Sequence, residues 1–257
     1  MMKPLLILVG VLSGAVAALA GPPDGPPVSG YQMMTPETQQ LQDDDFLNPA
    51  MFLVDRGITL WGREWTQGGA TCQSCHSDIA SDMAGVAARY PRIDPVSGQM
   101  VSLEGKIISE IAGRLGAPAP DYESEDLLAL TALIGFQSRG MPMNVAVTPD
   151  SGPWIAKGKE IFETRRGQLN LSCANCHQDH WGEKLRGDTL SQGHINAFPV
   201  YRLTWSDFGS RQRMFTWCME SIRSEPYAYG SEEFLAMETY LAVRGAGLPI
   251  ETPGVRR

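Results

Sequence analysis

The chain has 257 residues, of which 29 are acidic and 21 are basic, so its formal charge at pH 7 is −8. An acidic chain repels the phosphate backbone, which argues against nucleic acid as a partner. The length suits one large domain or two small ones, each able to bury a core. Composition thus limits the size and the partners of the protein but leaves its chemistry open.

Residues 1–20 have the features of a secretory signal peptide. Lys3 precedes an apolar stretch from Leu5 to Val11, and Ala18-Leu19-Ala20 matches the small-residue pattern that signal peptidase reads. The apolar stretch is shorter than the roughly 20 residues that span a bilayer, and nothing later in the chain approaches that length. We therefore expect cleavage after Ala20, a periplasmic location, and no membrane anchor in the mature protein.

Two C-x-x-C-H motifs carry the strongest chemical signal. They comprise Cys72, Cys75 and His76, and Cys173, Cys176 and His177. At this spacing two thiols form thioethers with the vinyl groups of haem, and the adjacent histidine ligates the iron. A lone copy could instead be a redox dithiol or half of a zinc site. Because both copies keep the histidine and follow an export signal, the sequence predicts two covalently bound c-type haems.

The sequence repeats itself around these motifs. Gly57 and Gly158 each lie fifteen residues before the first cysteine of a motif. Similar segments begin at Ser124 and Ser231, each with a serine N-cap, an acidic first turn and apolar residues at helical spacing. Matches in the same order around both motifs predict an all-α fold of two cytochrome c domains related by an internal repeat.

The domain boundary is expected in residues 141–153, where helical periodicity lapses and proline and glycine occur. We assign the first domain, with the first haem, to residues 49–145. The second domain, 146–257, would hold the second haem and the active site. Residues 21–48 open with GPPDGPPVSG and predict a flexible mature N-terminus.

Cys218 is the one cysteine outside the motifs, so it has no disulfide partner in the chain. It lies in a segment, 210–224, with neither Gly nor Pro, and it shares a helical face with Met214 and Phe215. One interpretation is a buried structural cysteine. The other is a thiolate on the iron of the second haem, where it would lower the reduction potential.

The first haem would then need a different sixth ligand. The repeat places the position that matches Cys218 near residues 109–111, with Glu110 the nearest match, and no cysteine lies between the two motifs. A weak oxygen ligand from Glu110 and a thioether both remain open. The thioether candidates are Met83, Met100, Met141 and Met143.

Three segments resemble the SoxA family of haem subunits. They are RRGQLNLSCANCH from Arg165, QGHINAFPVYRLTW from Gln192, and the run from Trp217 to Arg257. The resemblance implies a heterodimer with a SoxX-like monohaem cytochrome c and L-cysteine S-thiosulfotransferase activity. In that reaction thiosulfate is oxidatively joined to a cysteine of a SoxYZ-like carrier protein, and two electrons pass to haem. The resemblance also implies that Cys218 ligates the second haem opposite His177, as a thiolate or as a persulfide.

Two positions depart from the family pattern. Glu110 stands where dihaem members have a cysteine ligand, and Met214 stands where an arginine usually precedes the active cysteine by four residues. An anion such as thiosulfate needs fixed positive charge in a partly desolvated site. Arg211, on the face of Cys218, and Arg213, next to the family position, are the candidates to supply it.

Other functions fit the same features. A dihaem thiosulfate dehydrogenase would form tetrathionate without a carrier protein, and a dihaem electron-transfer cytochrome would have no catalysis of its own. A dihaem peroxidase is disfavoured, because a bound Cys218 would block the iron. His180 and His194 follow the second motif, but neither is expected to be a ligand.

Overall fold

The computed structural model describes residues 25–257, and the predicted signal peptide lies outside this range. Ten α-helices, two short 3-10 helices and seven strands of two or three residues follow one another along the described chain. Within this part no helix is long and apolar enough to cross a membrane. Helices dominate, as predicted, whereas the short strands were not expected.

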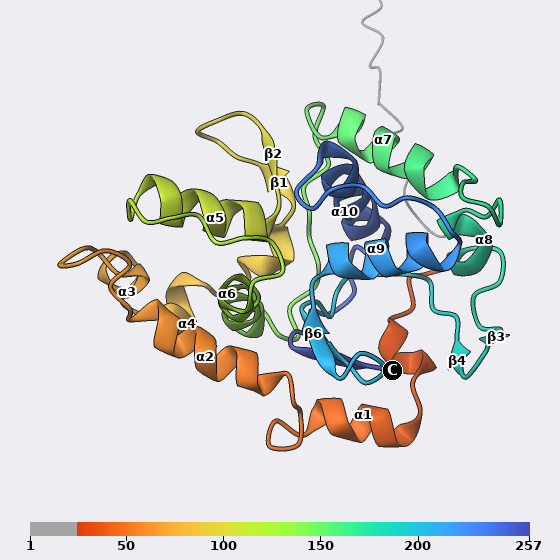
Figure 1. Cartoon of the computed structure of the whole chain (residues 1–257), viewed down its shortest axis with the longest axis horizontal. Helices are drawn as coiled ribbons and strands as arrows, with labels where there is room; N and C mark the ends of the chain where they lie inside the picture. The colour runs from red at the N-terminus through yellow and green to blue at the C-terminus, as the bar shows by residue number, and fades with distance from the viewer. Residues whose placement is uncertain (1–24) are drawn as a thin grey trace, which may run out of the picture.

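The first half is built on two crossing helices, α2 (Met51–Trp61) and α6 (Glu125–Phe136) (Figure 1). Gly57 lies at the crossing, where an added Cβ would come within 2.5 Å of the carbonyl oxygen of Ala129. Only glycine therefore lets the two backbones approach this closely. Ser124 caps α6 by accepting a hydrogen bond from the backbone N–H of Leu127.

The second half has the same kind of crossing between α7 (Gly152–Glu163) and α10 (Glu232–Arg244). A Cβ on Gly158 would overlap the carbonyl oxygen of Ala236. Ser231 caps α10 by accepting from the N–H of Phe234. The glycine and the serine cap that the sequence singled out in each half thus occur at corresponding places in the fold.

Short elements complete each half. The first half also contains α3 (Cys72–Cys75), α4 (Ile79–Asp82), η2 (Ala87–Arg89), β1 (Arg92–Ile93), β2 (Met100–Val101) and α5 (Leu103–Gly113). The second contains α8 (Cys173–His177), β3 (Lys184–Leu185), β4 (Asp188–Thr189), β5 (Val200–Arg202), β6 (Asp207–Gly209), α9 (Arg211–Ser221) and β7 (Gly254–Arg256). Strands β1 and β2 form an antiparallel pair, as do β3 and β4, and β5 lies between antiparallel β6 and parallel β7.

The N-terminal segment packs against the C-terminal end of the chain. It contains η1 (Gly30–Met33) and α1 (Pro36–Asp43), and α1 lies beside the C-terminus (Figure 1). The Gln42 side chain accepts a hydrogen bond from the N–H of Val255 at 3.0 Å, and Asn48 donates one to the carbonyl of Pro253 at 3.0 Å. The structure here differs from the flexible segment predicted over 21–48, because these contacts satisfy polar groups more than 200 residues apart.

Each half has its own apolar core, and the two halves meet through both apolar and polar contacts: Ala88 packs into the core of the second half, and Phe208 packs against the core of the first. The bridge between Pro142 and Pro249 joins the segments that follow α6 and α10. A buried ion network adds to it: Arg211 of α9 lies 3.4 Å from Glu104 of α5 and 3.2 Å from Glu238 of α10. The segment between α6 and α7 contains no helix, and its one β-bridge is the antiparallel bridge from Pro142 to Pro249.

Candidate functional site

The second C-x-x-C-H motif forms α8, which starts with a reciprocal cap. The hydroxyl of Ser172 accepts from the N–H of Asn175 at 3.3 Å, and the Asn175 side chain accepts from the N–H of Ser172 at 3.0 Å. This capping box fixes the turn from which both thiols and the histidine project. Burial raises the pKa of the Cys173 thiol to about 11, so the free thiol is neutral.

His177 is held in the form that a metal ligand requires. Its Nδ1 lies 2.8 Å from the carbonyl oxygen of Ser191. A carbonyl can only accept, so Nδ1 carries the proton and Nε2 keeps its lone pair. Burial lowers the pKa of His177, which favours the neutral ring that binds metal. Gly193 allows the loop to approach, since a Cβ there would lie 2.9 Å from Cγ of His177.

Arg244 ties this motif to the long helix α10. Its Nη2 donates to the carbonyl of His177 at 3.1 Å, and its Nη1 donates to the carbonyl of Gln192. The guanidinium also lies 5.2 Å from the centre of the Phe162 ring, within the range of a cation–π contact. One buried side chain therefore positions both the histidine and the loop behind it.

Helix α9 brings Cys218 to the same motif. Ser210 caps this helix by accepting from the N–H groups of Gln212 and Arg213. Burial raises the pKa of the Cys218 thiol to about 12, and the thiols of Cys173 and Cys176 are close enough to raise it further. Without a metal ion the Cys218 thiol is therefore neutral. The positive charge of a bound iron would stabilise the thiolate form. The histidine with a free Nε2 and the converging sulfurs fit a c-type haem.

Comparison with known proteins assigns the chain to a family. The family model for the SoxA/TsdA cytochrome c domain matches residues 56–143 and 157–250. L-cysteine S-thiosulfotransferase subunit SoxA from Paracoccus pantotrophus is 41% identical over 228 residues, which are 89% of this chain and 78% of the relative. The chain belongs to the SoxA family.

A second relative and a solved structure agree with that assignment. SoxA from Rhodovulum sulfidophilum is 42% identical over 229 residues, covering 89% of this chain and 79% of the relative. The crystal structure of SoxXA from P. pantotrophus superposes with a TM-score of 0.87 at 41% identity, covering 90% of this chain and 87% of the matched chain. The family predicted from the sequence is confirmed, and the two matched ranges are regions of cytochrome c fold, a class of domain that binds c-type haem.

Arg202 also lies near Cys218, although the sequence did not single it out. It ends β5, is 7% exposed, and its positive charge is close enough to Cys218 to lower the pKa of that thiol. Its guanidinium lies 4.2 Å from the centre of the Trp217 ring, and Nη1 donates to Sδ of Met214 at 3.2 Å. No carboxylate of the described residues forms an ion pair with it. A buried arginine without an ion-pair partner beside a candidate iron ligand is a candidate anion site.

The two arginines proposed from the sequence lie elsewhere. Arg211 is buried in the ion network with Glu104 and Glu238. Arg213 forms an ion pair with Asp207 at 2.8 Å and donates to the carbonyl of Phe208. Both side chains thus already have acceptors, whereas the hydrogen bonds of the Arg202 side chain go to a hydroxyl and a thioether, and its ionisable neighbours Cys218 and Asp188 form no ion pair with it.

The first motif lies in a more open setting. α3 has the same reciprocal cap, formed by Thr71 and Ser74. Cys72 is half-buried, but Cys75 and His76 are exposed. The His76 ring lies beside the Trp61 ring, with 5.9 Å between the ring centres. The Trp61 Nε1–H donates to the backbone carbonyl of His76 at 3.3 Å.

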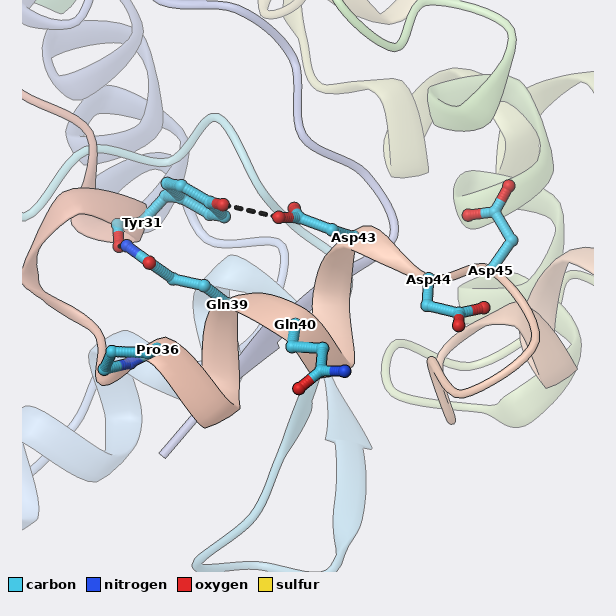
Figure 2. Close-up of a pocket in the computed structure, with 7 residues that line it drawn as sticks. All are labelled: Tyr31, Pro36, Gln39, Gln40, Asp43, Asp44 and Asp45. Carbon is cyan, nitrogen blue, oxygen red and sulfur yellow. Dashed lines mark hydrogen bonds between the residues drawn. The ribbon is translucent and has the colours of Figure 1, made fainter.

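The remaining polar features do not join this site. His194 is buried and lies 2.9 Å from the Gln192 side chain, and burial lowers its pKa to about 3; His180 is exposed beside Glu183. A surface groove along α1 is drawn in Figure 2, where the Tyr31 hydroxyl donates to Asp43 at 2.6 Å. The groove includes no residue of either C-x-x-C-H motif.

Proposed function

We propose that this chain is the catalytic haem subunit of an L-cysteine S-thiosulfotransferase. Thiosulfate and a cysteine thiol of a SoxYZ-like carrier protein form one new S–S bond. The thiol proton leaves to solvent and two electrons are removed, which balances the conversion of RSH and S2O3²⁻ to RS–S–SO3⁻. The names of the SoxA relatives support this activity.

The observation that carries the proposal is the place of Cys218. The fold brings this thiol to Cys173 and Cys176, although the two stretches lie more than forty residues apart. We propose that His177 and Cys218 are the axial ligands of the second haem, and that Cys218, as thiolate or persulfide, is the sulfur at which thiosulfate reacts. Bound haem would accept these electrons one at a time, since haem iron is a one-electron acceptor, and the haem of the proposed monohaem partner would take them onward.

Arg202 is the residue that we propose binds thiosulfate. A guanidinium offers both positive charge and paired N–H donors to an anion, and the neighbouring indole rings keep this one partly dry. The existing acceptors of Arg211 and Arg213 make those two arginines weaker candidates. Arg202 also compensates for the methionine at position 214, since its Nη1 lies against that side chain.

The proposal extends to two haems and two related domains. Thioethers would attach the first haem through Cys72 and Cys75 and the second through Cys173 and Cys176. We propose domains at 49–145 and 146–257, related by an internal repeat within an essentially helical fold. The matching glycine crossings, the serine caps of α6 and α10, and the two ranges of the family model support this division.

The proposed setting is the periplasm, with a SoxX-like monohaem cytochrome c as the partner subunit. The signal-peptide pattern at residues 1–20 supports export. The close structural match to a chain of the P. pantotrophus SoxXA crystal structure supports a heterodimer. Haem attachment through thioethers also suits an exported protein.

Turnover of a Cys218→Ala variant tests the proposal. Holoprotein with its monohaem partner is assayed with thiosulfate and a SoxYZ-like carrier, and the carrier adduct is measured by intact mass. The variant is expected to retain both haems and lose adduct formation. Ser221→Ala, an exposed change on the same helix, is the control and should behave like the wild type.

Normal turnover in Cys218→Ala would instead identify the chain as an electron carrier. The same assay without the carrier protein separates the remaining alternative. Tetrathionate formed from two thiosulfate ions, at a rate equal to that with carrier present, would identify a thiosulfate dehydrogenase.

A further inference from the structure

The two halves differ at the position that would supply the sixth ligand of the haem iron. Serine caps start both α5 and α9, at Ser102 and Ser210, and the same spacing of 108 residues takes Glu110 to Cys218. Position 110 is therefore where the first half would present its iron ligand. The side chain there is a carboxylate, and it already has other partners.

Both oxygens of Glu110 are bound by cations of its own helix. Oε1 lies 2.8 Å from Nζ of Lys106, and Oε2 lies 2.5 Å from Nε of Arg114. These pairs span one helical turn on either side, so they hold the carboxylate along the helix surface. A carboxylate neutralised in this way is a poor ligand for iron.

The methionine alternatives do not replace it. A side chain that ligates haem must be accessible to the iron, so a methionine packed into an apolar core is poorly placed to do so. The side chains of Met83, Met100 and Met143 are buried, at 7%, 5% and 4% exposure. Met141 is 39% exposed, but its sulfur lies against Gly85, in the segment that follows the first motif.

The histidine of the first half also lacks the support found in the second. In the second half, Phe198 lies 21 positions after His177, and this loop supplies the carbonyl that orients the ring. In the first half, Tyr90, the residue that matches Phe198 in the repeat, lies only 14 positions after His76. Within the described part of the chain, no residue of this shorter loop forms a hydrogen bond with the His76 ring.

A third difference concerns the arginine that braces the second motif. The spacing of 107 residues between α6 and α10 places Gln137 opposite Arg244. Gln137 donates to the carbonyl of Leu133 on its own helix, whereas Arg244 reaches the His177 backbone. The first half thus keeps the covalent motif and loses the sixth ligand, the orienting carbonyl and the brace.

We propose that the first haem iron is bound by His76 alone among the protein side chains, and that its sixth position is an exchangeable site for a small ligand such as water or cyanide. This inference rests on the proposed attachment of haem through Cys72 and Cys75. The first haem is then high-spin when oxidised, while the second, with two axial ligands, is low-spin.

Spectroscopy of the oxidised holoprotein tests this inference, after the haems per chain have been counted by intact mass. The expected result is two haems, one high-spin and one low-spin by electron paramagnetic resonance, with cyanide converting the high-spin signal. Glu110→Gln should leave the high-spin signal unchanged, and Glu110→Cys should convert it to low-spin and prevent cyanide binding.

Several outcomes would overturn the inference without touching the proposed thiosulfotransferase activity. One haem per chain, attached at the second motif, would mean that the first motif is empty, and would refute only the two-haem part of the proposed function. Two low-spin haems in the wild type, or a new spectrum in Glu110→Gln, would mean that the protein supplies a sixth ligand. A Glu110→Cys variant that stays high-spin with both haems attached would refute the position taken from the repeat. The proposed function fails separately, through the Cys218→Ala assay.

Discussion

Replacing Arg202 by methionine tests how the substrate anion is held. The change removes the charge and the N–H donors but keeps an unbranched apolar side chain beside Trp217 and Met214. A hydrogen bond to a charged group contributes about 1.5 to 3 kcal/mol. Since about 1.4 kcal/mol is a factor of ten, kcat/KM for thiosulfate should fall about 10-fold to 150-fold.

The assay is steady-state formation of the carrier adduct with thiosulfate varied and haem content matched. Arg202→Lys should recover part of the loss, because it restores the charge without the planar guanidinium. Arg213→Met is the control, since that side chain already pairs with Asp207, and it should change kcat/KM little. This control also tests the arginine proposed from the sequence.

Two results would refute the reasoning. An unchanged kcat/KM in Arg202→Met, with both haems bound, would remove Arg202 from the substrate site. A changed haem spectrum with unchanged kinetics for thiosulfate would show that Arg202 acts on the haem, for example through a propionate, rather than on the substrate.

Two further predictions concern stability. Gly158→Ala should lower the free energy of unfolding by about 1 to 3 kcal/mol in a denaturant titration, because the new Cβ overlaps the carbonyl of Ala236. The control is Gly113→Ala, whose new Cβ meets no atom within 4 Å and should not destabilise the protein. Equal effects of the two changes would refute the role of the crossing. Burial raises the pKa of Glu238 from 4.5 to about 7, although the positive charge of Arg211 opposes this rise. Between these two pH values the native state keeps a proton that the unfolded state releases. Stability should therefore fall as pH rises from about 4.5 to 7. Glu238→Gln should flatten this part of the stability profile relative to the wild type, and an unchanged profile would contradict the assignment.

The haem motifs and the recurring helical segments around them could be recognised because their signals are local or periodic. A C-x-x-C-H turn lies within five residues, and the glycine at each crossing keeps a fixed spacing from its motif. The structure places Gly57 and Gly158 where their lack of a side chain is needed. Cys218 could be singled out by arithmetic, because four of the five cysteines belong to the motifs.

The arginine near Cys218 could not be chosen from helical periodicity. Arg211 is seven residues before Cys218, which returns it to the same face but places it about 10 Å farther along the axis at 1.5 Å per residue. There the face meets Glu104 and Glu238 instead of the motif. Arg202 comes from β5, and its position depends on how that strand packs beside α9, which no local pattern records.

The N-terminal segment escaped prediction for a related reason. Its proline and glycine content predicted a flexible segment, but Gln42 and Asn48 form hydrogen bonds with backbone groups of the C-terminal strand region. Composition cannot show a contact between residues so far apart. Such contacts require the complete fold to be in place.

The proposed repeat also explains why the two halves can diverge without unfolding. The residues that hold each half together, the crossing glycine and the serine cap, occur in both halves. The residues that would define the iron site lie outside that scaffold, at position 110 or 218 and in the loop after the histidine. A change there would alter ligation and leave the helix packing intact, so the proposed catalysis could be confined to the second haem while the first half keeps its fold and its C-x-x-C-H motif.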